Sequence, residues 1–259
     1  MNTELEKAFE KTTKLLLGAE LRNLDEYGPW IGSHVPLPYP VKSALSGKEV
    51  WVPPPTNYLK KAFNPTKIVS FDEMDKVNTS PYSAEDIKNA TIKEIREKFI
   101  KPVAFHCGNF RYRTYENIEK TSGAGDGRNI YYCEDVYLGV KNVAFSNYAL
   151  FCENMFGCHS ITQSGFCIHA YNSLAVNRCF EVDGCSNSSD LLFCHNCENV
   201  HDSMFCFNAK NLKHAIGNVQ VPMETYRTIK TTVLNQMTTE LQKTKRLDLD
   251  IFNVGEWHG

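Results

Sequence analysis

The hydrophobic pattern predicts an amphipathic helix near each end of the chain. Within residues 2–22 the apolar residues recur at helical spacing, which places them on one side of a helix. A second helix is expected from Met223 to about Gln242. The apolar side consists of Leu5, Phe9, Leu16 and Leu17 in the first helix, and of Met223, Tyr226, Val233, Met237 and Leu241 in the second.

The remainder of the first 128 residues predicts short elements separated by proline-rich chain. Residues 48–52 are interpreted as a strand that ends at Pro53. Ser83 has the hydroxyl typical of a helix N-cap, and the helix after it would have an apolar side of Ile87, Ile92 and Ile95. Residues 29–65 form a proline-rich arm, and its aromatic residues suit a partner interface: Trp30, Tyr39, Trp51 and Tyr58.

Between residues 129 and 221 the pattern becomes a repeat. A Phe-Cys dipeptide, once replaced by Arg-Cys, recurs with cysteine spacings of 15, 12, 15 and 12. If the longer units carry a three-residue insertion after the cysteine, three columns of similar residues come into register. The columns are Cys152, Cys167, Cys179, Cys194 and Cys206; then Cys158, Ala170, Cys185, Cys197 and Ala209; and then Ser160, Asn172, Asn187, Asn199 and Asn211.

A unit of this length suits one coil of a narrow β-solenoid, because helical hairpin repeats need 30 or more residues. Coils stack about 4.8 Å apart, so equivalent residues form columns. Cysteine and alanine would fill the narrow interior, and stacked asparagines would form a hydrogen-bonded ladder. The predicted fold class is an α+β N-terminal region (1–128), a short parallel β-helix-like solenoid with coils of 12–15 residues (129–221), and a C-terminal capping helix and tail (222–259).

Composition supports this division and narrows the possible functions. Nine of the ten cysteines lie between Cys133 and Cys206. A formal net charge of −2 gives no general attraction to nucleic acid or to anionic membranes. No apolar run approaches the roughly 20 residues that span a bilayer, and the first residues lack the features of a signal peptide. We therefore expect a cytoplasmic or virion location, with reduced thiols in place of disulfides.

The end of the repeat resembles a known group of proteins. Residues 214–221 (His-Ala-Ile-Gly-Asn-Val-Gln-Val) followed by Glu224-Thr225-Tyr226 are similar to a junction in an uncharacterised group of Cys/Asn-rich repeat proteins. These proteins occur in metagenomic, small-genome prokaryote and phage sequences, and the resemblance covers about residues 129–242. The chain departs from the pattern at His214-Ala215 and Val219, and it has no cysteines after Cys206. The resemblance implies an architecture and carries no activity.

One cysteine cluster has nearly the spacing of a zinc knuckle, with one residue too few before the histidine. Its members are Cys194, Cys197, His201 and Cys206. The repeat already accounts for the three cysteines, and stacked columns do not converge on one point. The first expectation is therefore no cofactor, and zinc is the alternative.

Other candidate sites have simpler interpretations. The glycine-rich segment 122–128 lacks the Gly-Lys-Ser/Thr ending of a phosphate-binding loop and is predicted to be a flexible linker. His106 and Cys107 are adjacent, and neighbouring residues on a strand point to opposite faces. Asp190 and Asp202 would stack in register, as an acid and base pair or as solvated surface residues. We predict no catalytic residue.

These patterns favour a non-catalytic structural scaffold or protein–protein interaction subunit of a larger assembly. The resemblance suggests a phage virion component as its specific form. The alternatives are a zinc- or nucleic-acid-binding module built on the cysteines, and an enzyme using His106, Cys107 or the stacked carboxylates. Protein partners or self-assembly are expected, without a membrane, and nucleic acid is not favoured.

Overall fold

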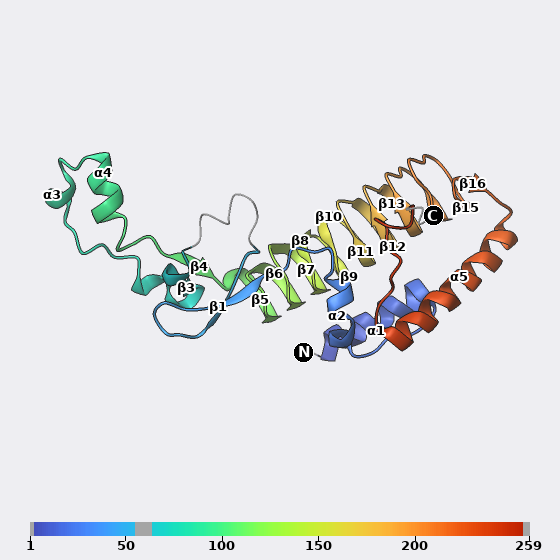
Figure 1. The fold of residues 1–259 in the computed structure, drawn as a ribbon, viewed down its shortest axis with the longest axis horizontal. Coiled ribbons are helices and arrows are strands. Elements are labelled where there is room, and N and C mark those ends of the chain that lie inside the picture. The colour runs from blue at the N-terminus through green and yellow to red at the C-terminus, as the bar shows by residue number, and fades with distance from the viewer. Residues whose placement is uncertain (1–2, 55–63, 256–259) are drawn as a thin grey trace.

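The computed structural model describes residues 3–54 and 64–255, and its centre is a β-solenoid (Figure 1). The solenoid makes about nine turns over residues 110–216, with helices along one side and a small lobe beyond one end (Figure 1). This confirms the predicted fold class. The solenoid strands are β5 (Phe110–Glu119), β6 (Gly123–Tyr131), β7 (Val136–Ala144), β8 (Asn147–Leu150), β9 (Glu153–Phe156), β10 (His159–Thr162), β11 (Gly165–Ala170), β12 (Leu174–Asp183), β13 (Ser186–His195), β14 (His201–Met204) and β15 (Ala215–Ile216).

The solenoid has a strict local period of three residues. From Asn142 to Gly217 every third residue has a positive φ, with Asn172 the exception. Paired residues of successive coils lie 12 positions apart, as Cys167 and Cys179 do. Each coil therefore consists of four three-residue sides joined by left-handed corners. The residue after each corner points into the coil, where space is narrow and small side chains fit: one coil contributes Cys152, Met155, Cys158 and Ile161, all buried.

The 15-residue cysteine spacing is therefore not an insertion. Three residues form one side, so a shift of 15 moves a side chain to the next coil and one side further round. Met155, not Cys152, pairs with Cys167, and Val182, not Cys179, pairs with Cys194. The predicted single cysteine column is wrong in register.

The solenoid also begins earlier than residue 129. The predicted linker at residues 122–128 is wrong, because most of it belongs to β6, which pairs in parallel with β5 and β7. Its glycines allow close packing of coils: a Cβ on Gly125 would lie 2.4 Å from the Tyr112 carbonyl oxygen. The segment has the composition of a linker because tight packing, not flexibility, requires the glycines.

One side of the solenoid, the helix-packed side, is covered by the terminal helices. Its outward residues join one core with α1 (Thr3–Leu17), α2 (Leu24–Ile31) and α5 (Met223–Thr244). The Phe9 and Phe156 rings lie 5.3 Å apart in an edge-to-face contact. The predicted apolar side of the first helix is buried. The outward residues of this side are Tyr131, Ala144, Phe156, Ile168, Phe180, Leu192 and Met204.

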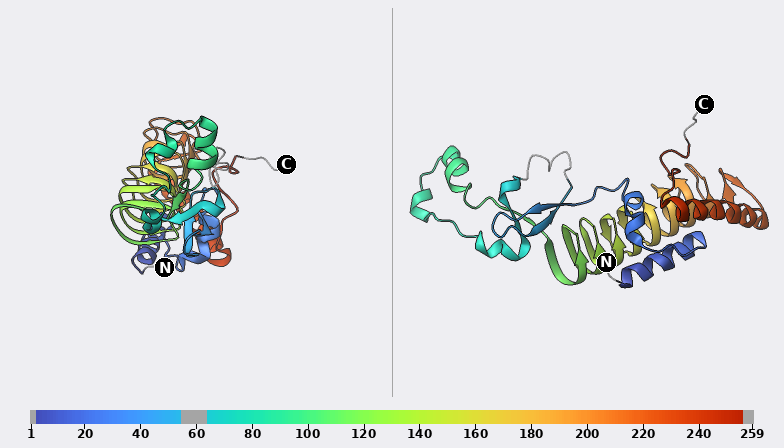
Figure 2. Two further views of the ribbon diagram at one scale, coloured as in Figure 1. Left: turned by 90° about the vertical axis from the view of Figure 1, so that its left-hand side faces the viewer. Right: turned by 60° about the horizontal axis from the view of Figure 1, so that its bottom comes forward.

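The C-terminal helix was predicted to cap the end of the solenoid. In the structure it runs back beside the solenoid toward α1 (Figures 1 and 2). Tyr226, Met237 and Leu241 of its predicted apolar side are buried, while Met223 is exposed. The last coil is instead covered by β16 (Val219–Gln220), which pairs antiparallel with β15. The buried side chains of the helix, Tyr226, Met237 and Leu241, join the core that the solenoid shares with α1.

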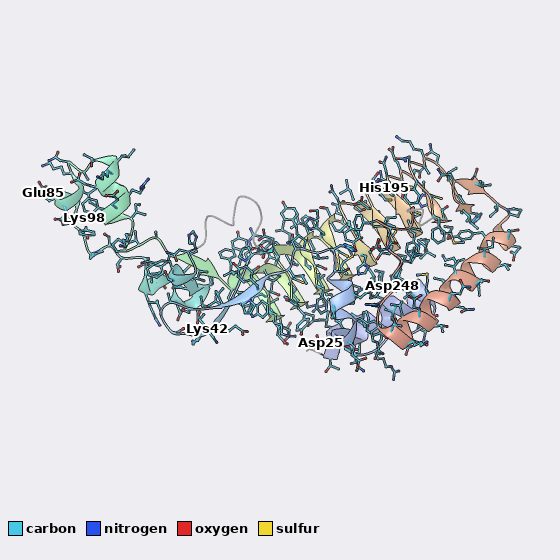
Figure 3. All side chains as sticks on the ribbon, in the orientation of Figure 1. Asp25, Lys42, Glu85, Lys98, His195 and Asp248 are labelled. Atoms are coloured by element: carbon cyan, nitrogen blue, oxygen red, sulfur yellow. The ribbon has the colours of Figure 1, made fainter. Side chains whose placement is uncertain are left out.

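The lobe precedes the first coil. It contains β1 (Tyr39–Lys42) paired with β2 (Glu49–Val52), and β3 (Ile68–Ser70) paired with β4 (His106–Gly108). Between β3 and β4 lie only short helical segments, which extend away from the solenoid where Glu85 and Lys98 are labelled (Figure 3). These segments are η3 (Phe71–Lys76), α3 (Ala84–Ile87), α4 (Ile92–Glu94) and η4 (Ile95–Phe99), and η2 (Pro65–Lys67) directly precedes β3.

The predictions for the first 128 residues have mixed outcomes. The strand at 48–52 is confirmed as β2, and Ser83 is the N-cap of α3, which is only one turn long. The aromatic arm is not a single exposed surface. Trp30 is buried, Tyr39 is exposed, Trp51 contacts the Tyr132 ring, and Tyr58 lies outside the described residues.

Candidate interaction surfaces

The solenoid cysteines are packing residues that also donate hydrogen bonds. The Cys194 thiol lies 3.4 Å from the Leu192 carbonyl oxygen and 3.8 Å from that of Ser203 on the next coil. Burial raises the pKa of the Cys133 thiol to about 12. All ten cysteines are free. A buried, protonated thiol suits a narrow interior, because it fills space and its S–H meets a carbonyl.

The zinc-like cluster is split between the inside and the outside of the coil. Cys194, Cys197 and Cys206 are buried in the interior. His201 lies outside, where its ring nitrogens contact Ser189 Oγ at 3.1 Å and Asn199 Oδ1 at 3.2 Å. Across the described residues, no group of three or more His, Cys, Asp and Glu side chains is arranged to hold a metal ion.

Asparagine ladders exist, but their membership differs from the prediction. Asn199 donates to Asn211 at 2.6 Å as expected, and Asn187 lies 12 residues before Asn199 in the same column. Asn172 belongs to another side, since Gly184 lies 12 residues after it. The longer ladder joins Asn117, Asn129, Asn142 and Asn154.

The other side chains considered as catalytic candidates are buried or contact neighbouring side chains. Burial raises the pKa of Cys107 to about 11, which keeps it a thiol. Asp190 binds the Arg178 guanidinium through two hydrogen bonds of 2.7 and 2.6 Å. Asp202 Oδ2 lies 4.0 Å from His214 Nε2, so the two stacked carboxylates each have a side-chain neighbour within the chain.

A buried polar cluster under the C-terminal tail was missed by the sequence reasoning. His169 hydrogen-bonds Glu181 on the next coil, and both side chains are buried. Glu181 Oε2 also accepts the Ile251 N–H at 3.0 Å, which ties the tail to the middle coils. The only sequence signal is that His169 and Glu181 are 12 residues apart.

A shallow groove of about 460 Å³ lies on the first three coils, where β-bulges interrupt the register. It has charges of both signs, and several are paired at its rim: Arg113 with Asp126 at 3.1 Å, and Lys141 with Glu153 at 2.8 Å. The groove residues include Tyr115, Glu116, Asp126, Arg128 and Lys141.

Large apolar side chains face solvent along one side of the solenoid and at the two successive corners that bound it, a region here called the outer corner. Tyr148, Phe151 and Leu174 define it, with exposed fractions of 51%, 54% and 51%. Later coils place Ser186-Asn187, Glu198-Asn199 and Lys210-Asn211 in the columns of Leu174 and Phe151, where the residues become polar. The apolar part is therefore confined to the earlier coils.

Backbone conformation makes the outer corner unusual. Tyr148 has a φ of 55° and Phe151 a φ of 54°, in the left-handed region that Asn and Gly occupy most easily. Asparagines occupy such corners at Asn187, Asn199 and Asn211. Two half-exposed aromatic side chains in this conformation gain little from folding.

No family model matches this sequence, and no curated protein sequence matches it significantly. Among the described helices, none is long and apolar enough to cross a membrane.

Proposed function

We propose that this chain is a non-catalytic scaffold that docks a protein partner at the outer corner. The observation that carries the proposal is the exposure of Tyr148 and Phe151 in left-handed backbone. Aromatic side chains with a polar surround are typical of the centre of protein interfaces. The stacked coils supply a rigid support, so the docking surface is formed before the partner arrives.

The expected partner presents an apolar surface with a polar edge. The outer corner exposes apolar side chains at Tyr148, Phe151 and Leu174, and the exposed amide of Gln163 lies on the coil between Phe151 and Leu174. Ion pairs such as Lys141–Glu153 are already satisfied within the chain. Apolar contact, not charge, is therefore the expected source of affinity.

The test compares wild-type protein with the double variant Tyr148→Asn/Phe151→Asn in its native cells. A photoreactive residue at Gln163 reports what contacts the corner, and native size-exclusion chromatography reports the complex. The wild type should form a discrete crosslink and elute as a complex, and the variant should lose both. Asn187→Gln, in the same column as Phe151, is the matched control. If wild type and variant give the same crosslinks and elution, the proposal is wrong.

A further inference from the structure

The groove on the first three coils results from the lengths of the coil sides. On this side the left-handed corners of the second coil, Asp126 and Asn129, are separated by two residues. The first and third coils have one residue more between their corners, which appears as a register shift of β5 and of β7 against β6. The second coil is therefore shorter here than both of its neighbours, and the groove of about 460 Å³ is lined by all three (Figure 1).

The local backbone keeps this groove open and limits what can enter it. Bulges on neighbouring strands reshape a sheet and are common next to functional sites. Gly139 lines the groove with a φ of 79°, and a Cβ at this position would meet no atom within 4 Å. A peptide could not add to β6 as a strand, because both edges of β6 are already paired, one with β5 and one with β7. A ligand of the groove therefore has to be recognised by side chains.

The charged side chains of the groove have both signs, and only some of them are paired. Asp126 and Lys141 each have an ion-pair partner outside the groove. Glu116 and Arg128 are neighbours in the register of β5 and β6, both are exposed, and neither makes an ion pair within residues 3–54 and 64–255. The groove therefore has a free acceptor and a free donor side by side. This combination suits a neutral ligand with hydroxyl groups, because a hydroxyl both donates and accepts hydrogen bonds.

Tyr115 adds an apolar surface beside these polar groups. It lines the groove and is 52% exposed, because no strand among the described residues pairs with the outer edge of β5. A sugar ring has a face of C–H groups and an edge of hydroxyls, so an aromatic ring matches its face. The planar fork of N–H donors on Arg128 matches two neighbouring hydroxyl oxygens on its edge.

We propose that this groove binds a saccharide, with one sugar face against the Tyr115 ring. Neighbouring hydroxyls donate to the Glu116 carboxylate and accept from the Arg128 guanidinium. Phosphorylated ligands are disfavoured, because the Glu116 carboxylate would repel them. The residues that define the outer corner do not line the groove, so this site is separate from the proposed protein-docking surface.

The first experiment screens the purified chain against immobilised oligosaccharides of neutral hexoses, N-acetylhexosamines and uronic acids. Each oligosaccharide that binds is then titrated in solution by calorimetry. An open groove with few polar contacts should give a Kd of about 0.1–1 mM. At least one class should bind, and the free oligosaccharide should compete. The proposal is wrong if none binds at concentrations up to about 10 mM, or if inorganic phosphate binds and no saccharide does.

Two alanine variants locate the site. Tyr115→Ala and Arg128→Ala should each lower the affinity for the oligosaccharide by about tenfold, because each removes one of its main contacts. Tyr39→Ala, at an exposed tyrosine on β1, is the matched control and should bind like the wild type. Circular dichroism checks folding, and Arg128→Ala, at an exposed position, still tests the site if Tyr115→Ala disturbs the first coil. Wild-type affinity in a folded Arg128→Ala variant would overturn the proposal.

A conservative variant separates the recognition of hydroxyls from simple charge attraction. Arg128→Lys keeps the positive charge but lacks the planar fork, so its affinity for the oligosaccharide should stay close to that of Arg128→Ala. The wild-type affinity should also change little with added salt, because a neutral ligand releases no counterions. Full affinity in Arg128→Lys, together with a steep loss of binding in salt, would indicate an anion site and would reject the saccharide.

Discussion

The solenoid carries two groups of large apolar side chains on its outside, and they differ in what covers them. On the helix-packed side, Phe156 and Phe180 are fully buried in a core shared with the terminal helices. At the outer corner, Phe151 and Tyr148 are more than half exposed. The coil backbone accepts either arrangement, because outward side chains do not affect the interior columns. An apolar residue on the outside therefore reports on a contact beyond the coil, and the helices supply that contact for only the first group.

The largest expected difference is between two phenylalanines on these two surfaces. Phe180→Ala should lower the free energy of unfolding by about 3–5 kcal/mol, because it opens a cavity beneath the helices. Phe151→Ala removes the same side chain from an exposed position and should change stability by about 0.5 kcal/mol or less. Urea denaturation of both purified variants measures the contrast. Similar losses in the two variants would mean that Phe151 packs within the chain.

A pH effect of about 3 kcal/mol is expected from a buried carboxyl group. Burial raises the pKa of Glu134 to about 7, and its side chain accepts a hydrogen bond from Ser122. Between pH 4.5 and 7 the folded chain keeps this proton while the unfolded chain releases it. The Glu134 contribution to stability is therefore full below pH 4.5, falls as pH rises, and levels off above about 7.

Glu134→Gln isolates this contribution, because glutamine does not titrate in this range. The difference in unfolding free energy between wild type and variant, measured from pH 4 to pH 8, should grow with pH in favour of the variant. A difference that stays constant with pH would show that Glu134 titrates normally. Glu153→Gln, the same substitution at an exposed position, is the control.

Part of this architecture is visible in the sequence. The 12-residue recurrence of small residues predicts a narrow solenoid, and the terminal helices follow from their apolar spacing. The shorter period of three is hidden, because the interior accepts Cys, Ala, Val, Ser, Met and Leu in one column. Met155 below Cys167 is an example: neither residue identifies the other as its neighbour. Because the column tolerates these different residues, the sequence pattern aligned Cys152 with Cys167, three residues (one side of the coil) away from Met155, the true neighbour.

The surfaces were harder to predict than the coil. The first coil was missed because β5 is exposed and β6 is rich in glycine, and both features are typical of linkers. The outer corner was missed because Phe151 was assigned to a repeating Phe-Cys column. In the structure Phe193 and Phe205 stack at 5.2 Å, while Phe151 lies on another side in solvent. Exposure depends on which side the helices cover, and the local sequence does not specify this.

The stability of the solenoid should depend more on the size of an interior side chain than on whether that side chain is a thiol. Cys194 lies in a column with Val182, and Ala170 occupies the same column one coil earlier. Cys194→Ala should therefore cost about 1 kcal/mol, whereas Cys194→Leu should overpack the coil and cost about 1–3 kcal/mol. Cys194→Val is the matched control for size and should lie nearest to wild type. Thermal melts that rank Ala below Leu would contradict a packing role.

The smallest effect expected is a gain in stability at the outer corner. Phe151 and Phe205 both have left-handed backbone, with φ near 54° and 55°, but only Phe205 stacks on another ring, that of Phe193. Asparagine tolerates this conformation better than phenylalanine, so Phe151→Asn should raise the free energy of unfolding by up to about 1 kcal/mol. Phe205→Asn relieves the same backbone but loses its ring contact, and it should destabilise the fold. Chemical denaturation of the two purified variants measures both signs. If Phe151→Asn destabilises the chain as much as Phe205→Asn, then Phe151 is held by contacts within the chain, and the outer corner loses its reason to bind a partner.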